Sequence, residues 1–253
     1  PNKCVLEIKI RETGCGLTFG QGVESYINGE YLGRIDKLEN MLKTKWHVDH
    51  WGNLHVQFGK SPELKEKCTR FYSEVRELFK DKFSIPLYLT GGNLLGLVRE
   101  NQFLDHDDDV DSSFILKPLV NDNVEDMFFS TFDSMLPTLL KNGYKINLVS
   151  ICHFHIYKPG MPWMDVLVGW IDSSGSWYRL SGYGGDIETV KFEYNTMEYL
   201  GHKVIIPKHF ERELEITYGE NWNVKDAQYS KDRDPVVMKM VHKMIYRNES
   251  RVE

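Results

Sequence analysis

The stretch FLDHDDDVDSSF, from Phe103 to Phe114, decides the fold because it sets five aspartates within seven positions directly before an apolar strand pattern. Such a run is most often a solvated acidic face. A calcium loop is a second possibility, but it needs glycine at its sixth position and glutamate at its twelfth. Counted from Asp105, those positions hold Val110 and Leu116, which excludes a calcium loop.

A divalent-metal site is the third interpretation of the aspartate run. If a strand begins here, its period of two places Asp107, Asp109 and Asp111 on one face and turns Asp108 to the other. Three convergent carboxylates repel one another unless a cation binds, and oxygen ligands suit Mg²⁺, Mn²⁺ or Ca²⁺. The pattern therefore predicts a Mg²⁺ or Mn²⁺ site, with Asp105 and Asp108 as bystanders.

A glycine pair lies a short distance upstream, in TGGNLLGLVRE, Thr90 to Glu100. Gly91 and Gly92 separate an expected strand from an expected helix, and the amides at a helix N-terminus bind anions such as phosphate. We expect this turn, together with Asn93, to hold phosphate. Arg99, farther along the helix, offers a forked donor for the same group, although a helical arginine is more often a surface or ion-pair residue.

Asp165 is the acidic residue of a later, otherwise apolar strand pattern, PWMDVLVGW. A carboxylate in such a strand must be paired or metal-bound. If its strand neighbours the aspartate strand, Asp165 becomes a fourth metal ligand or a catalytic base. His153 and His155 alternate onto one face of the preceding strand pattern and are candidates to bind donor or acceptor; a plain sheet histidine is an equally good interpretation of each.

The chain divides into a β-rich region of unknown role at residues 1–58 and a larger domain at residues 61–253. Asn28–Gly29 and Gly52–Asn53 each stand between β-forming residues, which predicts two hairpins in the first region. Periodicity, caps and turn residues predict helices over about 61–83, 93–101, 124–141 and 209–219, and strands over about 86–89, 110–116, 144–157 and 163–171. Strands mixed with helices in this order indicate an α+β or mixed α/β domain built on one sheet.

Composition excludes several classes of protein. The formal charge of −6 argues against nucleic acid as the partner. The sequence contains no run of about 18 apolar residues, so it predicts no transmembrane segment. The four cysteines are scattered without a metal or disulfide pattern. They favour the cytoplasm, including its membrane surface; the Golgi lumen is the alternative if an N-terminal anchor has been removed.

TGGNLLGLVRENQFLDHDDDVD, from Thr90 to Asp111, resembles the signature of the LicD/fukutin family, within the DNA polymerase β-like nucleotidyltransferase superfamily. That signature is a Gly-Gly turn, Leu-Leu-Gly, an arginine and an Asp-x-Asp-apolar-Asp run. VIIPKHFERELEITYGENW resembles the closing pattern of the family, and the resemblance spans about residues 61–223. It implies an α+β fold with a nucleotidyltransferase-like mixed sheet flanked by helices.

The resemblance also implies a function, namely Mg²⁺- or Mn²⁺-dependent transfer of phosphocholine or an alditol phosphate from a CDP-activated donor to a glycan hydroxyl, with release of CMP. CDP-ribitol, CDP-glycerol and CDP-choline are the candidate donors. By position, Gly91 and Gly92 match the phosphate turn of the family and Arg99 matches its arginine. Asp107, Asp109, Asp111 and Asp165 match its acidic positions. Asn93 departs from the usual Thr or Ser, and Asp105-His106 from the usual Pro-Trp or Pro-Phe.

Two rival functions use the same residues differently. A nucleotidyltransferase would pass a nucleoside monophosphate from a triphosphate to a small molecule and release pyrophosphate. A carbohydrate-binding module without catalysis would use tyrosine and tryptophan as sugar platforms, for which SWYRLSGYGG, Ser176 to Gly185, is suggestive.

Overall fold

The computed structural model describes strands at residues 6–9, 16–19, 24–27 and 30–34, and then residues 42–48, 54–116, 123–186, 192–226 and 237. The chain forms two compact units. Residues 1–65 and 105–108 make up the first unit, and residues 66–104 and 109–253 the second. The segment Asp105–Asp108 of the aspartate run therefore groups with the N-terminal region.

The first unit is built from antiparallel strands. β1 (Leu6–Lys9), β2 (Gly16–Phe19), β3 (Glu24–Ile27) and β4 (Glu30–Arg34) form one sheet in chain order, and β5 (Trp46–Val48) pairs with β6 (Leu54–Val56). Ile27 lies opposite Glu30, and Val48 opposite Leu54. These are the strand pairings of the two expected hairpins, whose turn residues Asn28–Gly29 and Gly52–Asn53 lie outside the described residues. A short helical turn, η1 (Phe58–Lys60), follows.

The first long helix begins where its capping residue was expected. α2 (Pro62–Leu78) is preceded by Ser61, whose hydroxyl accepts from the Leu64 N–H, and it continues as a π-helical segment, η2 (Phe79–Phe83). α3 spans Gly91–Glu100. α4 (Val124–Lys141) is capped by the Asn123 side chain, and α5 spans Phe210–Tyr218.

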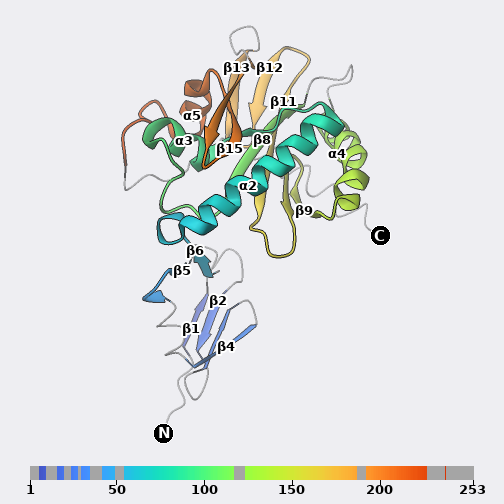
Figure 1. Ribbon diagram of the computed structural model, residues 1–253. Coiled ribbons are helices and arrows are strands. Elements are labelled where there is room, and N and C mark those ends of the chain that lie inside the picture. The colour runs from blue at the N-terminus through green and yellow to red at the C-terminus, as the bar shows by residue number, and fades with distance from the viewer. Residues whose placement is uncertain are drawn as a thin grey trace. The chain divides into compact units, whose positions relative to one another are not determined.

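A mixed seven-stranded sheet forms the centre of the second unit (Figure 1). Its strands are β7 (Tyr88–Leu89), β8 (Val110–Leu116), β9 (Lys145–Ser150), β10 (His153–Tyr157), β11 (Met164–Ile171), β12 (Ser176–Arg179) and β13 (Gly182–Asp186). β8 and β11 run parallel and the other pairs are antiparallel. β11 thus pairs with β8, β10 and β12. A separate hairpin joins β14 (Tyr194–Tyr199) to β15 (His202–Pro207).

The two faces of the central sheet have different roles. Phe114 of β8 and Phe154 of β10 lie on the same face, and they pack against η2 and α4 through contacts with Phe79, Phe128 and Phe132. Figure 1 shows α2 crossing the sheet and α4 beside it. Because side chains alternate along a strand, the aspartates of β8 and β11 project from the opposite face. Apolar burial thus fixes the side on which the polar groups lie.

The strand expected over 144–157 is two strands. Ile151 and Cys152 form a turn, Cys152 has a positive φ of 62°, and the pairing of β9 with β10 shifts register between His153 and Phe154. The β9–β10 turn carries none of the glycine, proline or asparagine that marks a turn in sequence, which explains the error. The strand pairs β12–β13 and β14–β15 were also not predicted as pairs.

The α+β class with a mixed sheet flanked by helices is confirmed, and so is a β-rich N-terminal region. Within the described residues, no helix has both the length and the apolar character needed to cross a bilayer.

Replacement of Gly96 by alanine tests the close packing of α3 against the segment from Gln102 to Leu104, which leads to the aspartates. A Cβ at Gly96 would lie 2.4 Å from the Gln102 carbonyl oxygen and 2.9 Å from the Leu104 nitrogen. We expect Gly96→Ala to lower the free energy of unfolding by about 1–3 kcal/mol, although alanine favours helix. Leu140→Ala, at an exposed position of α4, should change it by no more than about 0.5 kcal/mol in the same urea titration. Equal stabilities would contradict the steric reading.

Candidate metal centre

Asp111 lies directly on the glycine turn. Gly91 has a φ of +55°, and a Cβ built on it would stand 2.1 Å from Oδ2 of Asp111. The Gly92 N–H points to the same oxygen at 3.4 Å, and the Thr90 N–H donates to the Asp111 carbonyl at 3.1 Å. The carboxylate therefore lies at the N-terminus of α3, where the helix dipole favours negative charge. Only glycine gives the carboxylate this room.

Asn93 fixes the backbone of the aspartate segment. Its side-chain oxygen accepts from the Asp111 N–H at 2.6 Å, and its amide nitrogen donates to the Asp109 carbonyl at 3.2 Å. The side chain is 1% exposed. The amide thus completes the main-chain hydrogen bonds next to β8, which is a positioning role, whereas the sequence suggested direct contact with phosphate.

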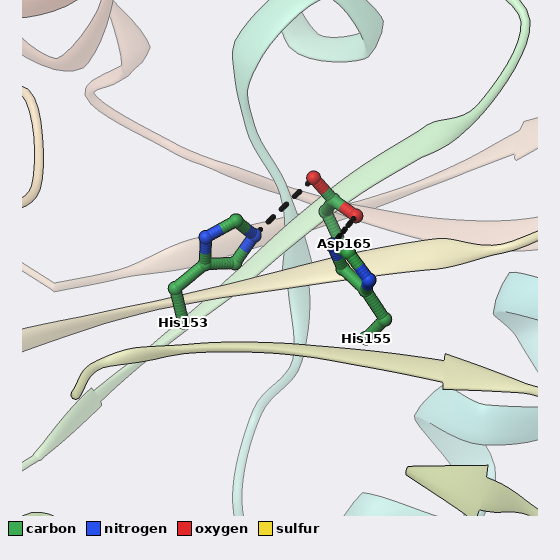
Figure 2. Close-up of side chains that lie close together, drawn as sticks. All are labelled: His153, His155 and Asp165. Carbon is green, nitrogen blue, oxygen red and sulfur yellow. Dashed lines mark hydrogen bonds and ion pairs between the residues drawn. The ribbon is translucent and has the colours of Figure 1, made fainter. Parts of the chain in front are cut away.

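Asp165 lies between two histidines (Figure 2). His153 Nε2 lies 3.3 Å from Asp165 Oδ2, and His155 Nε2 lies 3.1 Å from Oδ1. All three side chains are partly exposed, at 20–22% of their surface. Burial lowers the pKa of His155; the neighbouring Asp165 opposes that shift and His153 adds to it. Burial therefore favours the neutral form of the His155 imidazole.

Strand pairing brings the two predicted acidic positions side by side. Asp111 of β8 is the partner of Asp165 of β11, and Asp165 is the partner of His155 of β10. Neighbouring strands are about 4.8 Å apart. The three residues therefore form one row across the polar face of the sheet, as the sequence interpretation required for Asp165.

The remaining aspartates precede the strand. β8 begins at Val110, so the period of two that grouped three aspartates applies within the strand to Asp111 alone. Asp109 stands one residue before β8, and its carbonyl is held by Asn93. In the first unit, the Asp107 carbonyl accepts from the Phe58 N–H at 2.8 Å.

The presumed bystanders have partners of their own in the first unit. Asp108 Oδ2 lies 2.6 Å from His55 Nδ1, and Asp105 Oδ1 lies 3.1 Å from Lys65 Nζ. His106 is exposed beside Asp107, with its Nε2 3.8 Å from the carboxylate.

Arg99 lies at the other end of α3 from the glycine turn. Eight residues of helix separate it from Gly91, a rise of about 12 Å. Its guanidinium contacts Glu100 Oε1 at 3.0 Å and the Trp222 carbonyl oxygen at 3.5 Å. The ion pair with Lys225 and the contact with Arg99 lower the pKa of Glu100. The structure thus places Arg99 in an ion-pair cluster and does not bring it to the turn.

A buried polar network contacts Thr90, the residue that precedes the glycine turn. Arg179 of β12 contacts Glu213 of α5 at 2.7 Å and the Thr90 hydroxyl at 2.6 Å, and that hydroxyl donates to Glu213. All three side chains are at most 5% exposed. Burial raises the pKa of Glu213, against the opposing charge of Arg179. The residue immediately before Gly91 is therefore locked to two distant elements.

The donor atoms on the polar face fit a divalent cation. The Asp165 carboxylate supplies oxygen, and His153 and His155 supply imidazole nitrogen. Across the part of the chain that the structure describes, His153, His155 and Asp165 are the one group of three such residues whose ligand atoms lie within 4.8 Å of one another. The residues present therefore suit a metal, with Asp165 at the centre of the site.

Sequence reasoning placed His153 and His155 on one strand face but did not join them to Asp165 in one cluster, and it missed Arg179 and Glu213. No local signal marks the second pair, because β12 and α5 are far apart in sequence and only the fold joins them.

A cavity of about 360 Å³ lies away from these groups. It is lined by Arg76, Lys80, Ser84, Ile85, Pro86, Leu87 and Ile205. None of the predicted site residues contributes to its wall.

Comparison with known proteins gives a structural likeness at low sequence identity. No protein-family model matches this chain, and no curated protein matches it. Among solved structures, the chain is similar to the lincosamide antibiotic adenylyltransferase LnuA in its lincomycin-bound form, at 15% identity and a TM-score of 0.35. The match covers 59% of this chain and 89% of that one. So low a TM-score does not establish a shared fold, and the resemblance to the LicD/fukutin family rests on the motifs alone.

Loss of Arg179 should expose the cost of the buried glutamate. We expect Arg179→Met to lower the free energy of unfolding by about 3–5 kcal/mol near neutral pH, because the buried carboxyl of Glu213 loses its cationic partner. Since the folded-state pKa of Glu213 is raised above its usual 4.5, stability should fall as pH rises through the folded-state pKa, more steeply in the variant. Urea unfolding between pH 4.5 and 7.5 measures both effects. Arg179→Met/Glu213→Leu should regain most of the loss, and a double variant as unstable as the single one would contradict this account.

Proposed function

We propose that this chain is a metal-dependent transferase that moves a phosphate-linked group from a nucleotide-activated donor. The observation that carries the proposal is the seating of Asp111 on the Gly91–Gly92 turn, in register with Asp165 on the neighbouring strand. A metal carboxylate and a helix N-terminus then face one point, which is the combination that a diphosphate requires.

Each residue has a distinct role in the proposed reaction. Asp109 and Asp111 of the second unit would hold Mg²⁺ or Mn²⁺. When bound, the ion neutralises charge on the phosphate oxygens of the donor and on the leaving group. The amides of the glycine turn orient the phosphate, and Asn93 keeps the aspartate backbone in place.

Asp165 would complete the metal shell or take the proton of the attacking hydroxyl. Its carboxylate lies one strand away from Asp111, close enough to serve an acceptor bound against the polar face. The contacts from His153 and His155 hold its orientation. The acceptor oxygen forms the new bond to phosphorus while the bond to the nucleotide leaving group breaks.

Two donor classes are compatible with these groups. A CDP-activated alditol or choline as donor and a glycan as acceptor follow from the Thr90–Asp111 signature. A nucleoside triphosphate with a small-molecule acceptor would use the same carboxylates and the same turn. The products separate the two reactions, because the first releases CMP and the second releases pyrophosphate.

A non-catalytic carbohydrate-binding module is the rival outside enzymology. The exposed ring of Trp163 stacks on Tyr157 at 4.7 Å between centroids and 7° between planes, next to His155. Such a surface suits a sugar ring. Glycan binding that persists in EDTA and in the aspartate variants, without product release, would favour the module.

The deciding experiment supplies both donor classes in parallel. The protein is incubated with CDP-ribitol, CDP-glycerol or CDP-choline and a glycan panel, and separately with the four nucleoside triphosphates and small-molecule acceptors. Each reaction contains Mg²⁺, Mn²⁺ or EDTA, and CMP and pyrophosphate are quantified. Absence of metal-dependent product in every reaction would overturn the proposed function.

Substitution of the aspartates tests the metal site. We expect Asp109→Asn and Asp111→Asn each to lower turnover by about 10²–10³-fold or more. Each substitution removes a charged carboxylate ligand of the metal ion that stabilises the phosphate oxygens. Asp108→Asn, in the same run, is the matched control and should retain most activity. Full turnover in Asp109→Asn or Asp111→Asn would contradict the assignment.

Gly91→Ala tests the contact between the turn and Asp111. The added methyl group would overlap the Asp111 carboxylate, so turnover should fall about as far as in Asp111→Asn. Gly143→Ala is matched in backbone, with a φ of +79° but open space around its Cβ. Both variants should lose about 1–2 kcal/mol of stability from the positive φ, Gly91→Ala should lose more because of the overlap, and only Gly91→Ala should lose activity. Equal activities would indicate that the close approach has no catalytic importance.

A further inference from the structure

His153, His155 and Asp165 bring nitrogen ligands to a site that the aspartate motif describes in terms of oxygen alone. The two imidazole Nε2 atoms lie 3.3 and 3.1 Å from the two carboxylate oxygens (Figure 2). Two ligands of a tetrahedral zinc ion, each about 2.0–2.1 Å from the metal, are about 3.3 Å apart. Each histidine nitrogen is therefore as far from a carboxylate oxygen as two ligands of one ion are, and one ligand atom from each of the three residues lies within 4.8 Å of the others.

Strand alternation and strand pairing set the positions of these three residues. His153 and His155 alternate along β10, so both project from the polar face, and Asp165 lies directly opposite His155 on β11. Paired residues of antiparallel strands have Cβ atoms about 4.5–5.5 Å apart. A rigid sheet thus holds the three ligands, which favours a defined coordination geometry.

Two further residues hold the His155 ring. Asn147 of β9 lies opposite His155, with its side-chain nitrogen 3.4 Å from Nδ1. An asparagine can present either its oxygen or its nitrogen, and a metal-bound imidazole needs an acceptor at its other nitrogen. The Trp163 ring packs edge-on against His155 at 5.0 Å. The imidazole thus has the outer support that metal-binding histidines require.

The chemistry of the donors selects the ion. Carboxylate oxygens alone suit Mg²⁺, whereas imidazole nitrogen favours zinc, cobalt, nickel and similar transition metals. Three protein ligands leave one position open, as in sites where the metal contacts substrate. The site with two histidines and one carboxylate therefore favours a different metal ion from the aspartate site beside it.

We propose that His153, His155 and Asp165 bind a divalent transition-metal ion of the Zn²⁺ class, at a site additional to that of Asp109 and Asp111. Asp165 lies between the two sites, next to Asp111 on one side and His155 on the other. The site would take an oxygen of a phosphate or sugar ligand in its open position. It requires neither the donor nor the reaction proposed above.

Cobalt titration of the full-length, EDTA-treated protein tests this site directly. Co²⁺ bound through imidazole in a site of low coordination number gives an intense visible absorption, and hydrated Co²⁺ gives a weak one. We expect saturation at one ion for each chain, loss of the band when Zn²⁺ is added, and no loss in a large excess of Mg²⁺. A titration that shows only hydrated Co²⁺, or a band that Mg²⁺ removes, would overturn the proposal.

Single substitutions assign the ligands. His153→Ala, His155→Ala and Asp165→Ala should each weaken Co²⁺ binding by at least about tenfold, and Asn147→Ala by about tenfold, since supporting residues contribute on that scale. His209→Ala removes an exposed histidine before α5 and should bind as the wild type does. Circular dichroism checks that each variant is folded. Unchanged affinity in His153→Ala or His155→Ala would show that the histidines only donate hydrogen bonds to Asp165.

Asp111→Asn separates this inference from the proposed function. The variant should lose transfer activity but keep the cobalt band. A protein without transferase activity that retains the histidine-dependent band would refute the proposed reaction alone. An active protein without the band would refute the transition-metal site alone.

Discussion

The contact between the Gly91 backbone and the Asp111 carboxylate is the constraint on which the polar face depends. No side chain fits between them, and Gly91 also adopts a positive φ that other residues resist. Around this contact, the Thr90 N–H and the Asn93 amide hold the start of β8, and β8 in turn sets the register of β11. Displacement of the carboxylate would therefore disturb the turn, the strand and the row of polar residues together.

The buried Arg179–Glu213 pair helps to position the Gly91–Gly92 turn. An ion pair in the interior gains little net stability over apolar packing, because both charges lose their water. Its value here is geometric: it joins β12 and α5 to the hydroxyl of Thr90, the residue that precedes Gly91. The turn is thus held both by the strand that bears the aspartates and by elements late in the chain.

Local patterns in the sequence were sufficient for the fold class and for most elements of the second unit. The cap at Ser61 and the apolar alternation around Val110 mark elements that form where expected. The pairing of Asp165 with the aspartate strand was conditional in the sequence and is present in the structure. The partition of Asp105–Asp108 from Asp109 could not be read from the sequence, because it depends on which neighbours each half of the run contacts. The same holds for Arg99, whose partners Glu100 and Trp222 could not both be identified by spacing along α3.

The turn at Ile151 and Cys152 determines which chemistry the sheet presents. Beyond it, β10 reads His-Phe-His, in which both histidines project to one face and Phe154 to the other, under α4. A shift of one residue in this strand would exchange the two sets, with a phenyl ring beside Asp165 and imidazoles in the apolar core. The irregular backbone at Cys152 thus fixes the register of β10 in the sheet. An insertion or deletion of one residue there would remove the polar site while leaving every one of its side chains in the sequence.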